Sequence, residues 1–241
     1  MTDVVRVCVF CNKTVEAWLP FGEGLAGLSP FLQRLETIGS NVERFRCPHC
    51  SSFDRERHLR LYIERRNLFE PIRAGAVLHL SPEGSLRPLI RSYNPTLYVL
   101  GDLNPMDAEV QKIDMQKIRF PDETFDLAIA NHTLEHVEDL TLALREIHRV
   151  LKPGARFLCQ TPYASRLGKT LEEPGLQTES DRIFFYGQND HVRLFGLDIE
   201  ELIPAAGFVG RLVPHAEILP DVDGEAAGVN ELEPFFDFIR R

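Results

Sequence analysis

Four of the five cysteines form two closely spaced pairs, Cys8-x-x-Cys11 and Cys47-x-x-Cys50. A gap of this length lets both thiolates of a pair point at one ion from a tight turn, and two such turns complete the tetrahedral shell that Zn²⁺ prefers. We therefore predict a structural zinc site at Cys8, Cys11, Cys47 and Cys50. A redox dithiol is the alternative, but neither pair has the strand–helix–strand frame of a thioredoxin-like site.

Two other residues could be confused with zinc ligands. Cys159 lies in the apolar run 155–159 and is interpreted as a small buried residue. His49 lies inside the second cysteine pair and could replace a ligand, although four thiolates already fill the shell. Between the pairs, the Pro- and Gly-rich stretch 20–30 predicts a loop, and 31–38 predicts a short amphipathic helix.

The composition excludes several classes of protein. The chain has 241 residues, of which 44% are hydrophobic and 26% charged, so disorder and coiled coil are poor interpretations. The net charge of -9 disfavours a protein that coats nucleic acid. No apolar run reaches the roughly 18 residues of a membrane helix, and the start Met1-Thr2-Asp3 lacks the basic and apolar parts of a signal peptide. We expect a cytoplasmic protein with no membrane partner.

Beyond residue 74, short apolar runs alternate with helical segments. Strands are expected at 76–80, 96–100, 110–114, 125–131, 156–160 and 209–213, and helices at 86–91, 140–151 and 197–203. This alternation predicts an α/β fold whose parallel sheet is covered on both faces. The expected domains are a zinc-knuckle domain over 1–66, ending in a basic helix over 51–67, and a second domain over 67–241 with an insertion at about 162–190.

Polar residues follow the first four expected strands. Ligands bind at the carboxyl ends of the strands in such sheets. A carboxylate after the second strand, at Asp102, suits the two hydroxyls of a ribose, and Asp114 after the third suits an adenine amino group. The first and fourth strands are followed by Ser81, Glu83, Asn131 and His132. Together they predict an adenosine-containing cofactor.

The sequences DMQKIRFPDETFDL at 114–127, NHTLEHV at 131–137 and KPGAR at 152–156 resemble the class I S-adenosylmethionine-dependent methyltransferases, and the similarity extends over 74–215. The resemblance implies a Rossmann-like, mostly parallel seven-stranded sheet with strand order 3-2-1-4-5-7-6 and an antiparallel seventh strand. It implies S-adenosylmethionine as methyl donor and S-adenosylhomocysteine as product. The implied cofactor-binding residues are Leu80, Ser81, Glu83, Gly84, Asp102, Leu103, Asp114, Met115 and Asn131.

The chain departs from this family at its first strand. Members usually carry an acidic residue where His79 stands and a Gly-x-Gly pair where Ser81 and Glu83 stand, and only Gly84 is retained. Glycines there let the backbone approach the cofactor closely. We interpret Glu83 as a compensating acceptor for the methionine ammonium group. The loop SPEG, together with CPHC at 47–50 and HVRLFG at 191–196, resembles a subgroup of bacterial methyltransferases with N-terminal zinc knuckles.

Methyl transfer from a sulfonium requires in-line alignment, and a base where the acceptor loses a proton. The candidate catalytic residues are His191, His132 and His136. His136 could instead orient or pack, and Asp190 could either orient His191 or only cap a turn. A long segment between sheet elements is often a lid or a substrate-binding insertion. Substrate contacts are expected at His132, Tyr163, Tyr186 and Arg193.

We expect a methyltransferase that acts on the oxygen or nitrogen of a small-molecule or carbohydrate-like metabolite, as a monomer or homodimer. The first alternative is an RNA base methyltransferase whose zinc domain holds RNA through the basic residues between Arg55 and Arg66. Residues 1–66 carry a net charge of +2 and the remainder -11, so a nucleic-acid partner is disfavoured but stays open. The second alternative is a non-catalytic binding protein. The acidic stretch 219–230 is expected to be mobile, and 232–239 to dock as a helix.

Overall fold

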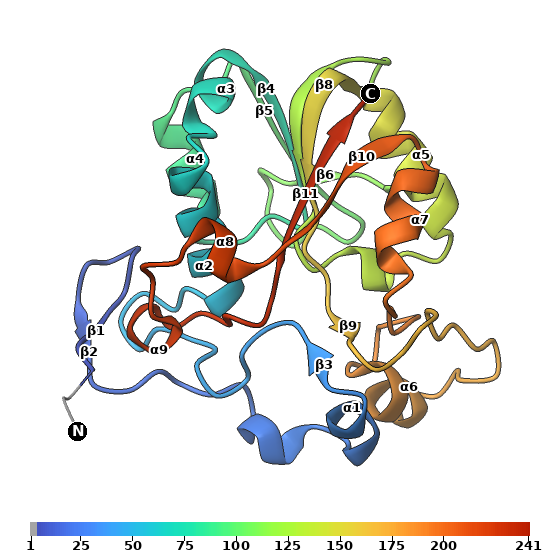
Figure 1. Ribbon diagram of the computed structural model, residues 1–241. Coiled ribbons are helices and arrows are strands. Elements are labelled where there is room, and N and C mark those ends of the chain that lie inside the picture. The colour runs from blue at the N-terminus through green and yellow to red at the C-terminus, as the bar shows by residue number, and fades with distance from the viewer. Residues whose placement is uncertain (1–3) are drawn as a thin grey trace.

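A seven-stranded sheet forms the centre of the molecule (Figure 1), as described for residues 4–241 by a computed structural model. The strands lie in the order β10-β11-β8-β7-β4-β5-β6, and only β11 runs antiparallel to both neighbours. The α/β class and the predicted strand order are confirmed. The start Met1–Asp3 lies outside the described residues. The strands are β4 (Ala76–Leu80), β5 (Leu97–Asp102), β6 (Gln111–Lys112), β7 (Phe125–Ile129), β8 (Leu151–Leu158), β10 (Phe208–Val213) and β11 (Phe235–Arg240).

Helices cover both faces of this sheet (Figure 1). One face carries α2 (Asp54–Arg65), α3 (Phe69–Ala74), α4 (Leu86–Ser92) and α8 (His215–Ile218), and the other carries α5 (Leu140–Val150) and α7 (Ile199–Ala205). In α5 the Asp139 carboxylate caps the helix by accepting from the Leu142 N–H at 2.9 Å. Its buried residues Ala143, Leu144 and Ile147 recur at helical spacing. Every helix in residues 4–241 is too short or too polar to cross a bilayer.

The N-terminal unit (residues 4–53) is built from short elements. They are β1 (Arg6–Val7), β2 (Thr14–Val15), a 3₁₀ turn (Gly24–Gly27), α1 (Pro30–Arg34) and β3 (Thr37–Ile38). The helix predicted over 31–38 is therefore wrong in its second half. Glu36 has a left-handed φ of 51°, which ends the helix, and β3 then pairs with β9 (Tyr163–Ala164).

The insertion packs on this N-terminal unit. Its helix α6 (Glu179–Tyr186) lies against α1 at the lower edge of Figure 1. Leu32 of α1 shares a small buried cluster with Tyr186 and Leu194. The insertion therefore has its own hydrophobic contact with the unit that carries the cysteines.

Three local predictions are wrong. The stretch 232–239 does not form a helix but contributes β11, the strand between β8 and β10. The stretch 219–230 is not a loose tail, because Val229 is buried and the Asn230 amide donates to the Gly39 carbonyl at 2.6 Å. The bounds of the strand expected at 156–160 are wrong, because β8 runs from Leu151 to Leu158 and its pairing with β7 shifts register.

Candidate functional site

The four paired cysteines come together. Sγ of Cys8 lies 3.6 Å from that of Cys50, and Sγ of Cys11 lies 3.9 Å from that of Cys47, with no disulfide. A Zn–S distance of about 2.3 Å in a tetrahedron separates sulfurs by about 3.8 Å, so the donor set fits Zn²⁺. His49 lies outside this set, because its ring donates to the Thr14 carbonyl at 3.1 Å.

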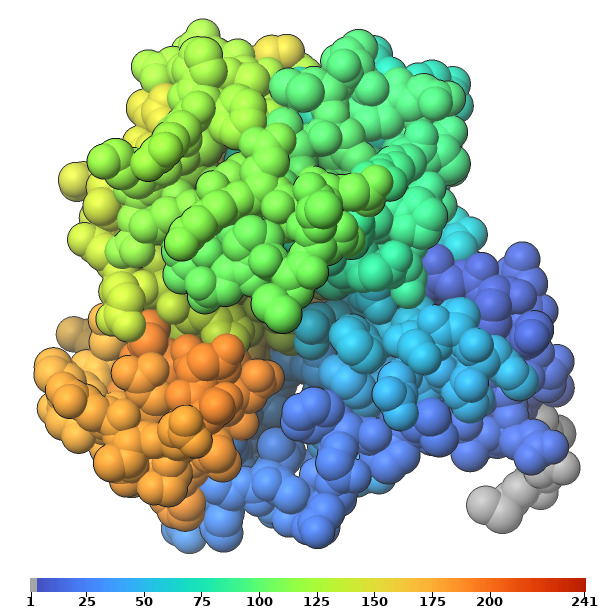
Figure 2. All heavy atoms as spheres, turned by 180° about the vertical axis from the view of Figure 1, so that it is seen from behind, coloured from blue at the N-terminus to red at the C-terminus, as the bar shows by residue number. Residues whose placement is uncertain are grey.

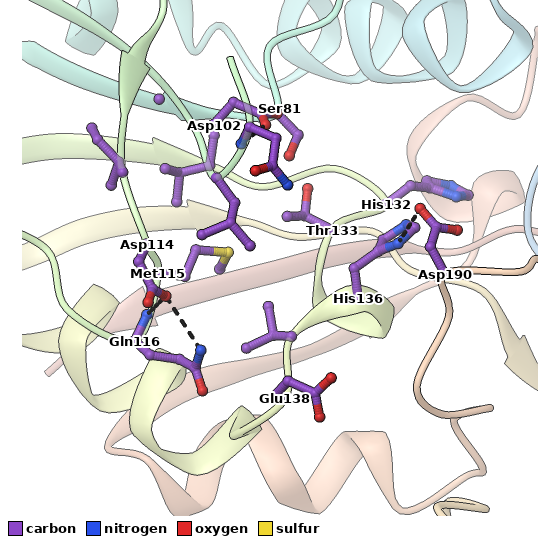
Figure 3. Close-up of a pocket in the computed structure, with 16 residues that line it drawn as sticks. Ser81, Asp102, Asp114, Met115, Gln116, His132, Thr133, His136, Glu138 and Asp190 are labelled. Atoms are coloured by element: carbon purple, nitrogen blue, oxygen red, sulfur yellow. Dashed lines mark hydrogen bonds and ion pairs between the residues drawn. The ribbon is translucent and has the colours of Figure 1, made fainter. Parts of the chain in front are cut away.

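A cavity of about 300 Å³ lies at the carboxyl ends of β4 and β5 (Figure 3), and we call it the strand-end cavity. The other strand-end residues that line it come from the loops after β6 and β7. Six of the expected cofactor-binding residues lie on its wall: Leu80, Ser81, Asp102, Leu103, Asp114 and Met115. Its size falls within the range of small-ligand sites.

Glu83, Gly84 and Asn131 lie outside this cavity. The buried Glu83 carboxylate accepts from His79 Nε2 and from Asn131 Nδ2, each at 2.8 Å. Burial alone would raise the pKa of Glu83, but these hydrogen bonds and the His79 charge hold it below its usual value. Glu83 thus binds His79, which stands at the position where class I methyltransferases usually carry an acid. A contact of Glu83 with the methionine ammonium group stays a prediction.

The loop after β4 has a backbone conformation that usually requires glycine, although Ser81 occupies the position. Ser81 has a φ of 46°, in the left-handed region that disfavours side chains with a Cβ. His132, which also lines the strand-end cavity, has a φ of 52°. Backbone strain of this kind concentrates at functional sites. Both strained residues line the cavity.

The acidic groups of the strand-end cavity are chemically suited to an adenosine. One oxygen of Asp102 accepts from the Asn104 N–H at 2.8 Å, and one of Asp114 accepts from the Gln116 N–H at 2.8 Å. The second oxygen of each has no hydrogen-bond partner within residues 4–241. Each of these two cavity-lining carboxylates therefore has one oxygen with acceptor capacity left for hydroxyl or amino donors.

A second cavity, of about 320 Å³, lies between the N-terminal unit and the insertion, and we call it the aromatic cavity. Figure 2 shows a recess where the segments around 20–45 and 180–195 face each other. Arg55 lies at this cavity with its guanidinium 5.3 Å from the Phe53 ring centroid, and it has no ion pair within the described chain. The apolar and aromatic part of the wall is Phe21, Leu28, Leu32, Val42, Phe45, Phe53, Pro162 and Tyr186.

His132 lines both cavities. Its Nε2–H donates to the buried Glu233 carboxylate at 2.9 Å, so Nδ1 faces the other way, 3.8 Å from Glu135 Oε1. Burial alone would lower the pKa of His132, but Glu233 raises it. Burial alone would raise the pKa of Glu233, but the hydrogen bonds and charges of His132 and His58 lower it to about 2.

Asp190 pairs with a different histidine from the one expected. Its carboxylate lies 3.2 Å from Nδ1 of His136 (Figure 3), whereas His191 Nδ1–H donates to the Tyr186 carbonyl at 2.8 Å. The three candidate histidines nevertheless lie together, since the ring centroids of His136 and His191 are 4.6 Å apart, and His132 and His191 both lie within 4.0 Å of Glu135 Oε1. Glu135 lies among all three and is the residue of the Leu-Glu-His element that sequence reasoning passed over.

Of the remaining residues that were expected to contact substrate, one lies at a cavity and two do not. Tyr186 lines the aromatic cavity, but Tyr163 is buried in the main core and lies on neither cavity wall. The buried Arg193 guanidinium donates to the Leu134 and Glu138 carbonyls, at 3.0 and 2.9 Å, and to Glu172. Its contacts hold the turn that carries His136, and they leave no donor facing either cavity.

The buried carboxylate of Asp54 makes stability depend on pH. Burial raises the pKa of Asp54 from 3.8 to about 6, and the Glu233 charge adds to this, so its stabilising contribution is complete below pH 3.8 and is lost as pH rises through 6. Asp54→Asn is therefore expected to be about 3 kcal/mol more stable than the wild type near pH 8 and nearly equal near pH 4. Urea unfolding at both pH values measures this, and no gain at the higher pH would contradict it.

One part of the chain matches a family of known proteins. Residues 93–159 match the family model of the methyltransferase domain. The ubiquinone/menaquinone biosynthesis C-methyltransferase of Rhodopseudomonas palustris is 39% identical over 56 residues, 22% of this chain and 22% of that protein. The mitochondrial arginine-hydroxylase of Rattus norvegicus is 32% identical over 149 residues, 59% of this chain and 38% of that protein. The chain thus spans less than two fifths of either relative's length.

A solved S-adenosylmethionine dependent methyltransferase of Mesorhizobium loti has a TM-score of 0.48 at 16% identity, covering 73% of this chain and 94% of that one. The family match includes β5, β7 and α5. The matched segment 93–159 contributes Asp102, Asp114, His132 and His136 to the strand-end cavity.

Proposed function

We propose that this protein transfers the methyl group of S-adenosylmethionine to a small-molecule acceptor bound in the aromatic cavity. The observation that carries the proposal is the position of His132, which lines both cavities. A donor bound in the strand-end cavity and an acceptor bound in the aromatic cavity would meet at this side chain. This arrangement supplies the in-line approach that displacement at a methyl carbon requires.

The donor would bind through the two acids of the strand-end cavity. Asp102 offers an oxygen to the ribose hydroxyls and Asp114 offers one to the adenine amino group. In the reaction, the bond from methyl carbon to sulfur breaks with its electron pair on sulfur, and the acceptor atom forms the new bond to carbon. An acceptor hydroxyl or amine loses its proton in the same process, and His132 would accept this proton at Nδ1, the ring nitrogen that does not bind Glu233.

The wall of the aromatic cavity favours an acceptor with a flat or apolar body. Phe21, Phe45 and Phe53 give it aromatic surface, and Arg55 adds a positive charge that suits a carboxylate, phosphate or phenolate oxygen. We therefore propose methylation at oxygen or nitrogen of such a metabolite, in preference to a carbohydrate. The Rhodopseudomonas palustris relative is named a C-methyltransferase, so product analysis should score carbon as well.

The zinc ion is proposed to hold the cysteine turns that support one wall of the aromatic cavity. Phe53 lies three residues after Cys50 and stacks on Phe45, with ring centroids 4.6 Å apart. The RNA alternative loses support, because most of the basic cluster has intramolecular partners: Arg60 pairs with Glu64, Arg65 with Asp221, Arg66 with Asp237, and Arg57 is buried.

Asp102→Ala tests the donor site. A hydrogen bond to a charged group contributes about 1.5–3 kcal/mol, so the Kd for S-adenosylhomocysteine is expected to rise at least about tenfold. Isothermal calorimetry measures it, and Asp107→Ala is the matched control, since Asp107 is an exposed acid of the same loop that lies off the cavity wall. Equal affinity in the two variants would remove Asp102 from the ribose role.

A further inference from the structure

Glu135, His136 and His191 form a cluster with the makings of a metal site. One ligand atom from each lies within 4.8 Å of the others. Glu135 and His136 come from the turn after β7, and His191 comes from the loop after α6. His136 lines the strand-end cavity and His191 lines the aromatic cavity, so the cluster lies where the two cavities meet.

His191 is oriented as a ligand would be. A carbonyl only accepts, so the hydrogen bond to Tyr186 O places the imidazole proton on Nδ1 and leaves the lone pair on Nε2. His191 is 4% exposed, and its Nε2 has no hydrogen-bond partner within residues 4–241. This is the arrangement in which metal-binding histidines are held by a carbonyl behind the ring.

The lone pair of His191 Nε2 faces Glu135 Oε1 at 4.0 Å. Two electron-rich atoms held opposite each other in a buried site favour a positive species between them, and His132, with Nδ1 3.8 Å from the same oxygen, lies to one side of this gap. Metal–nitrogen and metal–oxygen bonds of about 2.0–2.2 Å each would span this gap with one ion. Oε2 of Glu135 already accepts from the Thr161 hydroxyl at 2.8 Å, which fixes the carboxylate with Oε1 toward the histidines.

His136 completes the set. Its ring meets that of His191 edge to face, and the Asp190 carboxylate lies 3.2 Å from its Nδ1. A carboxylate paired with a histidine in this way holds the ring and increases its basicity as a ligand. Asp190 is thereby assigned a positioning role toward His136, in place of the expected role toward His191.

We propose that Glu135, His136 and His191 bind a divalent first-row transition-metal ion. Two imidazoles and one carboxylate are the donor set that such ions bind with coordination positions left open. Those positions would face the acceptor, whose oxygen the ion would bind and make more acidic. This catalytic role rests on the proposed function. The binding of the ion does not.

Co²⁺ titration of the zinc-loaded full chain tests the proposal. Calorimetry is expected to show one Co²⁺ bound per chain beyond the zinc, and the visible spectrum is expected to lack strong thiolate-to-metal absorption, because the cysteines keep their zinc. Changes around metal ligands typically cost 10–100-fold in affinity, so Glu135→Gln and His136→Gln are each expected to weaken Co²⁺ binding by more than about tenfold. His148→Gln is the matched control, since His148 packs on Phe208 away from both cavities.

His136 is partly exposed, so its variant keeps the test valid even if the buried Glu135 variant fails to fold. Absence of Co²⁺ binding by zinc-loaded wild type would overturn the proposal, as would equal binding by His136→Gln and the control. Binding that depends on His136, in a protein that fails to bind S-adenosylhomocysteine, would keep the metal site and reject the proposed function.

Discussion

Replacing Cys47 with serine is expected to remove zinc and unfold the N-terminal unit in one step. The hydrophobic cluster around the cysteines is small, with only Cys8, Val15, Trp18 and Cys47 fully buried. A core of this size cannot offset the entropy of ordering its loops. Structural zinc binding contributes folding free energy on the order of 10 kcal/mol, so losing one thiolate should cost most of the unit's stability.

Trp18 is the only tryptophan, and its indole donates to the Glu225 carbonyl at 2.9 Å, so its fluorescence reports on this unit and on its contact with the segment around Glu225. We expect metal analysis of Cys47→Ser to find no zinc, and the Trp18 emission to shift to that of an exposed indole. His49→Ala, in the same turn but bonded to Thr14, should keep one zinc and the native emission. A Cys47→Ser protein that stays folded without metal would refute the assignment.

Arg57→Met is expected to be the most destabilising change outside the cysteines, at about 3–5 kcal/mol. Arg57 is fully buried, and its guanidinium donates to the carbonyls of Arg44, Ser52 and Gly228 while lying 4.2 Å from the Trp18 ring centroid. Methionine fills a similar volume but donates nothing, so these buried carbonyls would lose their partner. Chemical denaturation followed by Trp18 fluorescence measures the loss.

The control for this change lies on the same helix. Arg65 pairs with Asp221 at the surface, where both side chains are well exposed, so Arg65→Met should cost no more than about 1 kcal/mol. A similar cost for both variants would show that Arg57 does not join the N-terminal unit to α2 and the segment around Gly228. Equal stability of Arg57→Met and the wild type would contradict the packing account directly.

The sheet was predictable because its strands are buried on both faces. β4 and β7 are apolar apart from one residue each, His79 and Asp126, which is typical of central parallel strands. Burial on both faces also explains why β11 was not predicted as a strand. Phe235 packs in the hydrophobic core on one face of the sheet, and Phe236 and Phe238 pack in the core on the other face. Without apolar–polar alternation, a run near the chain end resembles a helix as much as a strand. The density of aromatic residues was the usable signal, since these favour strands.

The cysteine cluster was predictable from spacing alone, whereas the cavities were only partly so. Asp102 and Asp114 follow strands, and their places on one cavity wall follow from parallel-sheet topology. Glu233 belongs to no motif, and it meets His132 across 101 residues of sequence only because β11 inserts into the sheet. The aromatic wall depends on the packing of α1 against α6, a contact between two short helices far apart in the sequence that no local pattern encodes.

A crystal structure of the full chain with S-adenosylhomocysteine tests the central claim most directly. We predict the nucleoside in the strand-end cavity, with the ribose hydroxyls on Asp102, the adenine amino group near Asp114, and the sulfur directed toward His132 and the aromatic cavity. Absence of the ligand from this cavity at saturating concentration, or its binding elsewhere on the protein, would contradict the account.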